Sequence, residues 1–251
     1  MELGLGGRGY LLTGASRGLG FATARALVDD GARVLISSRS AGSVEAAVSS
    51  LGTAASGVPA DLAEPGDADR LVSTALDRLG TIDGALISVG GPKPGSVLGT
   101  AEEDWRAGVD SVLLGPLRLV KALVPHLTAG ACIGFVLSTS VRQPLDGLAI
   151  SNGLRPGLAM TAKGLADELG PRGIRVFGLM PGTIATERIA EIAEASGDAD
   201  TYRTQTEAAI PLGRIGQPEE FGRVAAFLLS PAASYVTGTV VAVDGGRLRS
   251  P

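Results

Sequence analysis

Short apolar runs alternate with longer amphipathic segments along the whole of this 251-residue chain. Apolar runs of about four to eight residues between Gly, Pro or polar residues are typical of buried strands, whereas a recurrence every three or four positions indicates helices. The pattern predicts strands at residues 10–12, 31–39, 57–62, 83–88, 132–137, 174–179 and 239–243. It predicts helices at residues 21–27, 43–51, 67–79, 102–127 and 154–169.

Strands separated by helix-length segments indicate parallel pairing through right-handed crossovers. The chain is therefore expected to adopt an α/β fold, a doubly wound Rossmann-type parallel sheet of about seven strands with helices on both faces. No composition shift or long polar linker divides the sequence, so residues 1–251 are expected to form a single dinucleotide-binding domain.

Composition narrows the classes of partner and site. A net charge of −4 with dispersed Lys and Arg gives no reason to expect nucleic acid or an anionic membrane as partner. Cys132 is the only cysteine and lies in an apolar strand pattern, where an inert buried thiol is expected. With one His and one Cys, a metal site is not expected. The N-terminus lacks the apolar stretch of a signal peptide and no run reaches membrane-spanning length, so a cytoplasmic protein is expected.

A glycine-rich turn follows the first predicted strand, where residues 13–20 are Thr-Gly-Ala-Ser-Arg-Gly-Leu-Gly. A strand, such a turn and then a helix are typical of a dinucleotide diphosphate site. One glycine permits the tight turn, a second lets backbone approach phosphate, and a third lets the helix pack on the strand. The alternative is a plain tight turn. The cofactor-binding residues expected in this glycine turn are Gly14, Ser16, Arg17, Gly18, Leu19 and Gly20.

The end of the second predicted strand indicates which dinucleotide is bound. An NAD site usually places Asp or Glu at this position, whereas an Arg pairs with the additional phosphate of NADP. Here the residues are Ser38 and Arg39, and together with Arg17 they could form a phosphate pocket. NADP(H) is therefore favoured over NAD(H). The alternative is that both arginines are solvated surface charges.

Further motifs make the chain similar to the short-chain dehydrogenase/reductase family, and in particular to its ketoacyl-carrier-protein reductase-like branch. The resemblance covers nearly the whole chain and rests on the glycine turn and on Asp61-Leu62, Ser138, Pro181-Gly182 with Thr186, residues 213–220 and residues 243–246. It implies that Asp61 and Leu62 lie against the adenine and Gly90 beside the cofactor ribose. It further implies cofactor contacts from Pro181, Gly182, Ile184 and Thr186, the last two at the nicotinamide amide.

The same resemblance implies a substrate lid around residues 186–212 and a homotetramer or homodimer that packs through the two long helices.

The sequence differs from the family at the catalytic positions. The family's proton-relay tetrad consists of an Asn on the fourth helix, a Ser after the fifth strand, and a Tyr and a Lys on the fifth helix. By spacing, these positions are Val112, Ser138, Ser151 and Arg155. The resemblance therefore implies an atypical member with a degenerate tetrad, in which Ser138, Ser151 and Arg155 occupy the catalytic positions.

These substitutions change the proton chemistry. A serine alcohol is a far weaker acid than a tyrosine phenol of pKa about 10, and losing a general acid typically costs about 10²–10⁴ in rate. Arg155 can still bond the nicotinamide ribose, but it does not release a proton near neutral pH. Lys93, Asp146 or Tyr202 could replace the acid, although each is also explained as a solvated loop residue. For His126, a dipole or capping role explains the position better than catalysis.

Two functions from different classes fit this sequence. The first is an NADP(H)-dependent oxidoreductase for a small-molecule carbonyl or imine and its alcohol or amine, in which Ser138 polarises the substrate and an unusual group or water supplies the proton. The second is a catalytically weak or inactive nucleotide-binding pseudoenzyme. The glycine turn, Ser138 and the lid segment favour the first.

Overall fold

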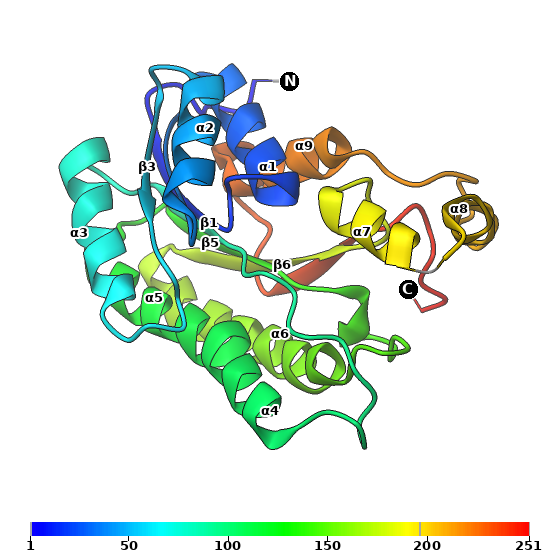
Figure 1. Ribbon diagram of the computed structural model, residues 1–251. Helices are drawn as coiled ribbons and strands as arrows, with labels where there is room; N and C mark the ends of the chain where they lie inside the picture. The colour runs from blue at the N-terminus through cyan, green and yellow to red at the C-terminus, as the bar shows by residue number, and fades with distance from the viewer. Residues whose placement is uncertain (1, 196, 251) are drawn as a thin grey trace.

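A parallel sheet runs through the middle of the molecule (Figure 1). The computed structural model describes residues 2–195 and 197–250, and within them seven strands pair in the order β3-β2-β1-β4-β5-β6-β7. Every neighbouring pair is parallel. The strands are β1 (Gly9–Thr13), β2 (Arg33–Ser38), β3 (Ala55–Pro59), β4 (Gly84–Ile87), β5 (Cys132–Val136), β6 (Arg175–Pro181) and β7 (Thr239–Val243).

Helices cover both faces of the sheet (Figure 1). Buried side chains of α3, α5 and α6 share one core with the sheet, and those of α1, α2 and α9 share the other. These layers confirm the doubly wound α/β fold. The α-helices are α1 (Gly18–Asp29), α2 (Ala41–Leu51), α3 (Asp67–Leu79), α4 (Glu102–Gly108), α5 (Gly115–Leu123), α6 (Ala149–Leu169), α7 (Glu187–Ala195), α8 (Ala199–Ala208) and α9 (Pro218–Leu229). No helix in the described residues is long and apolar enough to cross a membrane.

The central strands are apolar on both sides because each side faces a helical layer. Along β1, Leu11 belongs to the core under α3, α5 and α6, whereas Tyr10 and Leu12 belong to the core under α1, α2 and α9. Successive side chains of a strand point to opposite faces. A strand buried on both faces therefore appears in the sequence as a continuous apolar run rather than an alternation.

Three of the differences between the predicted and the observed element boundaries lie close to the site. The third strand, β3, ends before Asp61, whose backbone N–H instead donates to Asp67 Oδ2 at 2.7 Å as the chain turns into α3. The long helix expected over residues 102–127 is interrupted by a π-helical segment, η1 (Val109–Leu114), which separates α4 from α5. Helix α6 begins at Ala149, earlier than predicted. The sequence prediction missed its first turn because the small and polar residues there carry no helical periodicity.

Two buried polar side chains hold the end of α9 against the sheet. Arg175 of β6 donates to the backbone oxygens of Leu228 at 2.8 Å and Ser230 at 2.9 Å, carbonyls near the C-terminus of α9. The thiol of Cys132 donates to the oxygen of Leu229 at 3.1 Å. Burial raises the pKa of this thiol to about 12, which agrees with the inert buried thiol expected from the sequence.

Candidate cofactor and active site

The candidate site lies at the edge of the sheet where the parallel strands end. The chain leaves β1 for its neighbour β2, whereas β4 pairs on the other side of β1, so the strand order reverses between β1 and β4. Open α/β sheets bind ligands at such a switch point, outside the carboxyl ends of the strands. The glycine turn follows β1 here, and Ser138 follows β5 at the same edge.

The glycine turn packs too tightly for side chains at its key positions. Gly14 has a φ of +58°, and a Cβ there would lie 2.7 Å from the backbone oxygen of Ser88. A Cβ on Gly20 would lie 2.5 Å from the oxygen of Gly14, which explains how α1 approaches the strand end. Thr13 fixes the turn to the end of β4: its hydroxyl donates to the oxygen of Ser88 at 2.8 Å and accepts from the N–H of Ser88 at 2.9 Å.

The end of β2 lies beside this turn, because the N–H of Ala15 donates to the oxygen of Ser37 at 3.0 Å. In the described part of the chain, Ser38 Oγ is the one buried side-chain oxygen without a hydrogen-bond partner. Arg39 follows it and is exposed. A buried hydroxyl normally has a partner, so an unpartnered hydroxyl followed in the chain by an exposed cation fits a ligand that brings its own hydrogen-bonding groups.

The side chain of Arg17 forms an ion pair that the sequence did not predict. Its Nη1 pairs with Glu187 Oε2 at 2.5 Å, and both side chains are largely exposed. Glu187 is the first residue of α7, so the ion pair joins the glycine turn to the segment expected to form the lid. Thr186 reaches the same turn, with its Cγ2 at 3.5 Å from where a Gly18 Cβ would be.

The corner after β3 is fixed by its own hydrogen bonds. Asp61 accepts from the N–H of Ala63 at 3.0 Å, and Leu62 is buried beneath it. The segment after β6 is anchored on the C-terminal tail. A Cβ on Gly182 would lie 2.6 Å from the Cα of Asp244, and Ile184 bridges to Gly216. Asp61, Gly182 and Ile184, three of the expected cofactor positions, thus contact other segments of the chain, and Leu62 is buried.

Three serine hydroxyls gather where β5 ends and α6 begins. Ser138 Oγ accepts from the N–H of Ser140 at 3.1 Å. The hydroxyl of Ser140 in turn lies 3.1 Å from that of Ser151, and both residues are buried. The hydroxyl partner of Ser151 is therefore Ser140, a residue that the sequence gave no reason to select. A serine hydroxyl donates one hydrogen, and no group in this cluster is an acid strong enough to protonate an alkoxide readily.

Arg155 brings a positive charge to the cluster from the next turn of α6. It is only 5% exposed, and its Nη1 donates to the oxygen of Val136 at 2.8 Å. Burial, and to a smaller degree the charge of Arg188, lowers the pKa of its guanidinium to about 10. Arg155 therefore stays protonated at neutral pH. Val112, the remaining tetrad position, lies fully buried in the π-helical segment η1 and offers no polar group.

The alternative acids predicted from the sequence have different surroundings. The ammonium group of Lys93 pairs with Asp104 Oδ2 at 2.8 Å, and Asp146 is exposed. Tyr202 is half-buried on α8. His126 is exposed at the end of a short 3₁₀ turn, η2 (Val124–His126). Among them, the ammonium of Lys93 is held by an ion pair.

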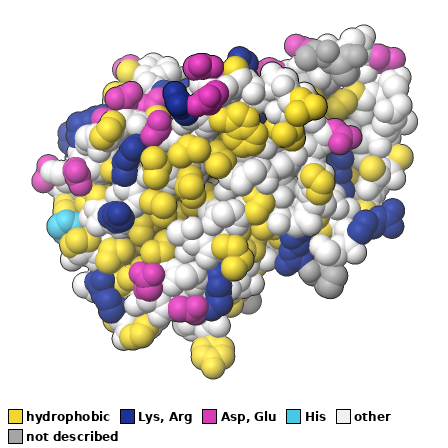
Figure 2. Space-filling view, turned by 90° about the horizontal axis from the view of Figure 1, so that it is seen from below, with side chains coloured by type: hydrophobic (Ala, Val, Ile, Leu, Met, Phe, Trp, Pro, Cys, Tyr) yellow, Lys and Arg dark blue, Asp and Glu magenta, His cyan; other side chains and the backbone are white. Residues whose placement is uncertain are grey.

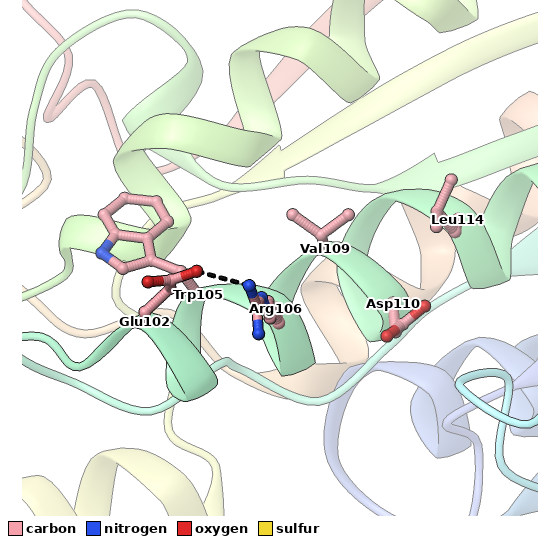
Figure 3. Close-up of a pocket in the computed structure, with 6 residues that line it drawn as sticks. All are labelled: Glu102, Trp105, Arg106, Val109, Asp110 and Leu114. Atoms are coloured by element: carbon pink, nitrogen blue, oxygen red, sulfur yellow. Dashed lines mark ion pairs between the residues drawn. The ribbon is translucent and has the colours of Figure 1, made fainter.

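A shallow hollow lies elsewhere, on the outer surface of α4 and η1 (Figure 3). The Glu102–Arg106 ion pair of 2.5 Å spans one side of it. The indole of Trp105 faces α6, where a Cβ on Gly153 would lie 2.9 Å from its Cζ3. None of the expected cofactor or catalytic residues lines this hollow. Its lining residues are Glu102, Trp105, Arg106, Val109, Asp110 and Leu114.

The chain is similar to known proteins in both sequence and fold. Residues 14–247 match the family model described as "Enoyl-(Acyl carrier protein) reductase". The chain is 35% identical to human (Homo sapiens) "Dehydrogenase/reductase SDR family member 4" over 243 residues, which cover 94% of this chain and 86% of that protein.

Two solved structures are similar in fold and sequence. L-sorbose reductase from Gluconobacter frateurii, in complex with NADPH and L-sorbose, has a TM-score of 0.94 and 28% identity, with 100% of both chains covered. An NADPH-bound short chain oxidoreductase from Pseudomonas aeruginosa PAO1, which contains an atypical catalytic center, has a TM-score of 0.91 and 27% identity. That match covers 97% of this chain and 98% of the other.

Proposed function

Because the chain belongs to the short-chain dehydrogenase/reductase family, we propose that it is an NADP(H)-dependent oxidoreductase for a small-molecule carbonyl or imine and its reduced partner. The observation that carries the proposal is that the glycine turn and the Ser138–Arg155 cluster lie at one edge of the sheet. NADPH bound by the two structural relatives supports the choice of cofactor.

The residues at this edge fit a phosphorylated dinucleotide. The glycine turn would hold the diphosphate with its backbone N–H groups and the N-terminus of α1. The unpartnered Ser38 hydroxyl and the exposed Arg39 would hold the additional phosphate of NADP(H). When bound, the cofactor supplies or accepts a hydride. Gly90, Pro181, Ile184 and Thr186 are proposed to position its nicotinamide half, with Arg155 at the ribose.

The serine cluster would act on the substrate oxygen. Ser138 is the hydroxyl proposed to donate a hydrogen bond to the carbonyl, and the charge of Arg155 favours negative charge developing there. Ser151 is a poor proton donor, so we propose that water or a lid residue delivers the proton. A slow proton-transfer step is the expected consequence, because a positioned acid usually contributes about 10²–10⁴ in rate.

One observation also favours a second candidate, a nucleotide-binding pseudoenzyme. The tetrad positions present Val112, Ser151 and Arg155, and none of these side chains is a general acid near neutral pH. Both candidate functions predict that the protein binds NADPH, but the oxidoreductase also predicts turnover. Oxidation of NADPH in the presence of aldehydes, ketones and imines, followed by absorbance, separates them. Turnover with at least one compound supports the oxidoreductase, whereas tight NADPH binding without oxidation supports the pseudoenzyme.

The Arg17–Glu187 ion pair gives a first testable prediction. In the proposed complex Glu187 competes for Arg17 with the additional phosphate of NADPH, so Glu187→Gln is expected to tighten NADPH binding. Exposed ion pairs contribute about 0–1 kcal/mol, which limits the gain to roughly fivefold. Fluorescence titration measures the gain in affinity, with NADH as the control ligand because it lacks the additional phosphate that NADPH carries. An equal gain for NADH would contradict the competition.

A second prediction concerns association. Helices α4, α5 and α6 form the lower face of the molecule in Figure 1, and Figure 2 shows hydrophobic side chains gathered over it. Leu114 of η1 is 38% exposed and Met160 of α6 is 72% exposed. Such a patch usually marks an interface, and a symmetric dimer or tetramer is expected. Sedimentation at micromolar concentration should show the oligomer, and Leu114→Arg should shift it towards monomer. A monomeric unmodified protein would contradict the prediction.

A further inference from the structure

The guanidinium of Arg188 lies directly on the backbone of Gly91. A Cβ on Gly91 would overlap the Nη1 and Cζ atoms of Arg188, so the absence of a side chain there makes room for the cation. Arg188 is the second residue of α7, and Gly91 follows the end of β4 and Gly90. The start of the proposed lid is thus in contact with the loop that leaves the sheet at the switch point.

In the described part of the chain, this guanidinium has no anionic partner. Within residues 2–195 and 197–250, no ion pair or hydrogen bond involves the side chain of Arg188, and its neighbour Glu187 pairs with Arg17 instead. Arg188 lies close enough to Arg155 for its charge to lower the pKa of the Arg155 guanidinium. The hydrogen bond that Arg155 donates goes to the neutral carbonyl of Val136. Two nearby like charges favour binding of an anion, because its negative charge offsets their mutual repulsion.

We propose that the substrate carries an anionic oxygen group, a carboxylate or phosphate, and that Arg188 binds this group while it packs on the backbone of Gly91. Arg155, which is buried, adds a second positive charge to the site. A planar guanidinium suits such groups because it can donate two parallel N–H bonds. The inference rests on the proposed oxidoreductase function and adds the substrate class, an oxo acid or oxo phosphate. Ser138 would meet the carbonyl, while Arg188 would hold the charged end.

The test compares charged and neutral forms of one substrate. Arg188→Met is expected to lower kcat/KM for an oxo acid by roughly 10-fold, the lower range for a hydrogen bond to a charged group. The methyl ester of the same acid should be unaffected. Gly91→Ala should have the same selective effect, because its Cβ displaces the guanidinium without removing the charge. Arg78→Met, which removes an exposed arginine at the end of α3, is the matched control and should leave kcat/KM unchanged for both the acid and the ester.

Two binding measurements show whether Arg188 binds the anionic group of the substrate or a phosphate of the cofactor. Neither measurement requires turnover. Oxamate, an unreactive carboxylate, is titrated by calorimetry into the NADP+ complex. Binding to the unmodified protein that weakens in Arg188→Met supports the proposal, even if no carbonyl is reduced. NADPH affinity is measured on the same variants. If Arg188→Met weakens NADPH and leaves oxamate binding and the acid-to-ester ratio unchanged, Arg188 binds a cofactor phosphate and the proposal is wrong. Equal loss for acid and ester overturns it as well.

Discussion

Arg39→Asp is expected to change the ratio of NADPH to NADH affinity by about 100-fold or more in favour of NADH. The substitution removes a charge-assisted bond to the additional phosphate and places a carboxylate that repels it. The same carboxylate can accept hydrogen bonds from the ribose hydroxyls of NADH. Arg39 should carry most of the preference, because Arg17 is already paired with Glu187 whereas Arg39 is exposed beside the orphan hydroxyl of Ser38.

The control for this prediction is Arg78→Asp, which makes the same charge change on an exposed residue of α3. It corrects for the altered net charge of the protein. Fluorescence titration of both cofactors at two salt concentrations separates a local phosphate contact from general attraction, since screening weakens the latter. Equal affinities of the unmodified protein for NADPH and NADH would show that Ser38 and Arg39 do not form a phosphate pocket.

Ser151→Tyr combined with Arg155→Lys is expected to raise kcat/KM for carbonyl reduction by about 10²-fold, the lower end of what a general acid contributes. A phenol needs a neighbouring ammonium to lower its pKa towards neutrality, so each single change should give much less than the pair. Ser151 and Arg155 lie one turn apart on α6, and Ser151 already lies among the serine hydroxyls. The introduced phenol is therefore expected near Ser138.

The matched control is Ser151→Phe with Arg155→Lys, which has the same ring without the hydroxyl. Ser151 is buried, so NADPH affinity and thermal stability must be measured on each variant to show that the larger ring is accommodated. A loss of activity in a folded, NADPH-binding tyrosine variant would mean that Ser151 and Arg155 serve another chemistry. The interpretation of these positions as a degenerate tetrad would then be wrong.

Local signals predicted the sheet and the glycine turn well. Apolar runs identified the strands because β1, β4 and β5 are buried on both faces, and Gly14 and Gly20 occupy positions where a side chain would collide with backbone. The lid helices α7 and α8 were not predicted as helices, since their sequences are polar and carry few apolar anchors. Helix α9 did carry a signal, a capping box between Gln217 and Glu220 with Pro218 at its first position.

The site itself was only partly predictable. Spacing along one helix put Ser151 and Arg155 on the same side, since residues four apart share a face. Pairings between distant segments carry no such signal. The contact of Arg188 with Gly91, the ion pair of Arg17 with Glu187 and the bond of Ser151 to Ser140 all depend on how loops meet at the edge of the sheet.

Binding of NADP(H) and transfer of a hydride at this edge of the sheet can be followed together by isotope transfer. NADPH carrying deuterium at both positions of its reactive ring carbon is incubated with the protein and a panel of oxo acids, ketones, aldehydes and imines, and the products are analysed by mass spectrometry. One deuterium is expected in the reduced product of at least one compound, with oxo acids reacting best. Saturating NADPH binding with no deuterium in any product would contradict it.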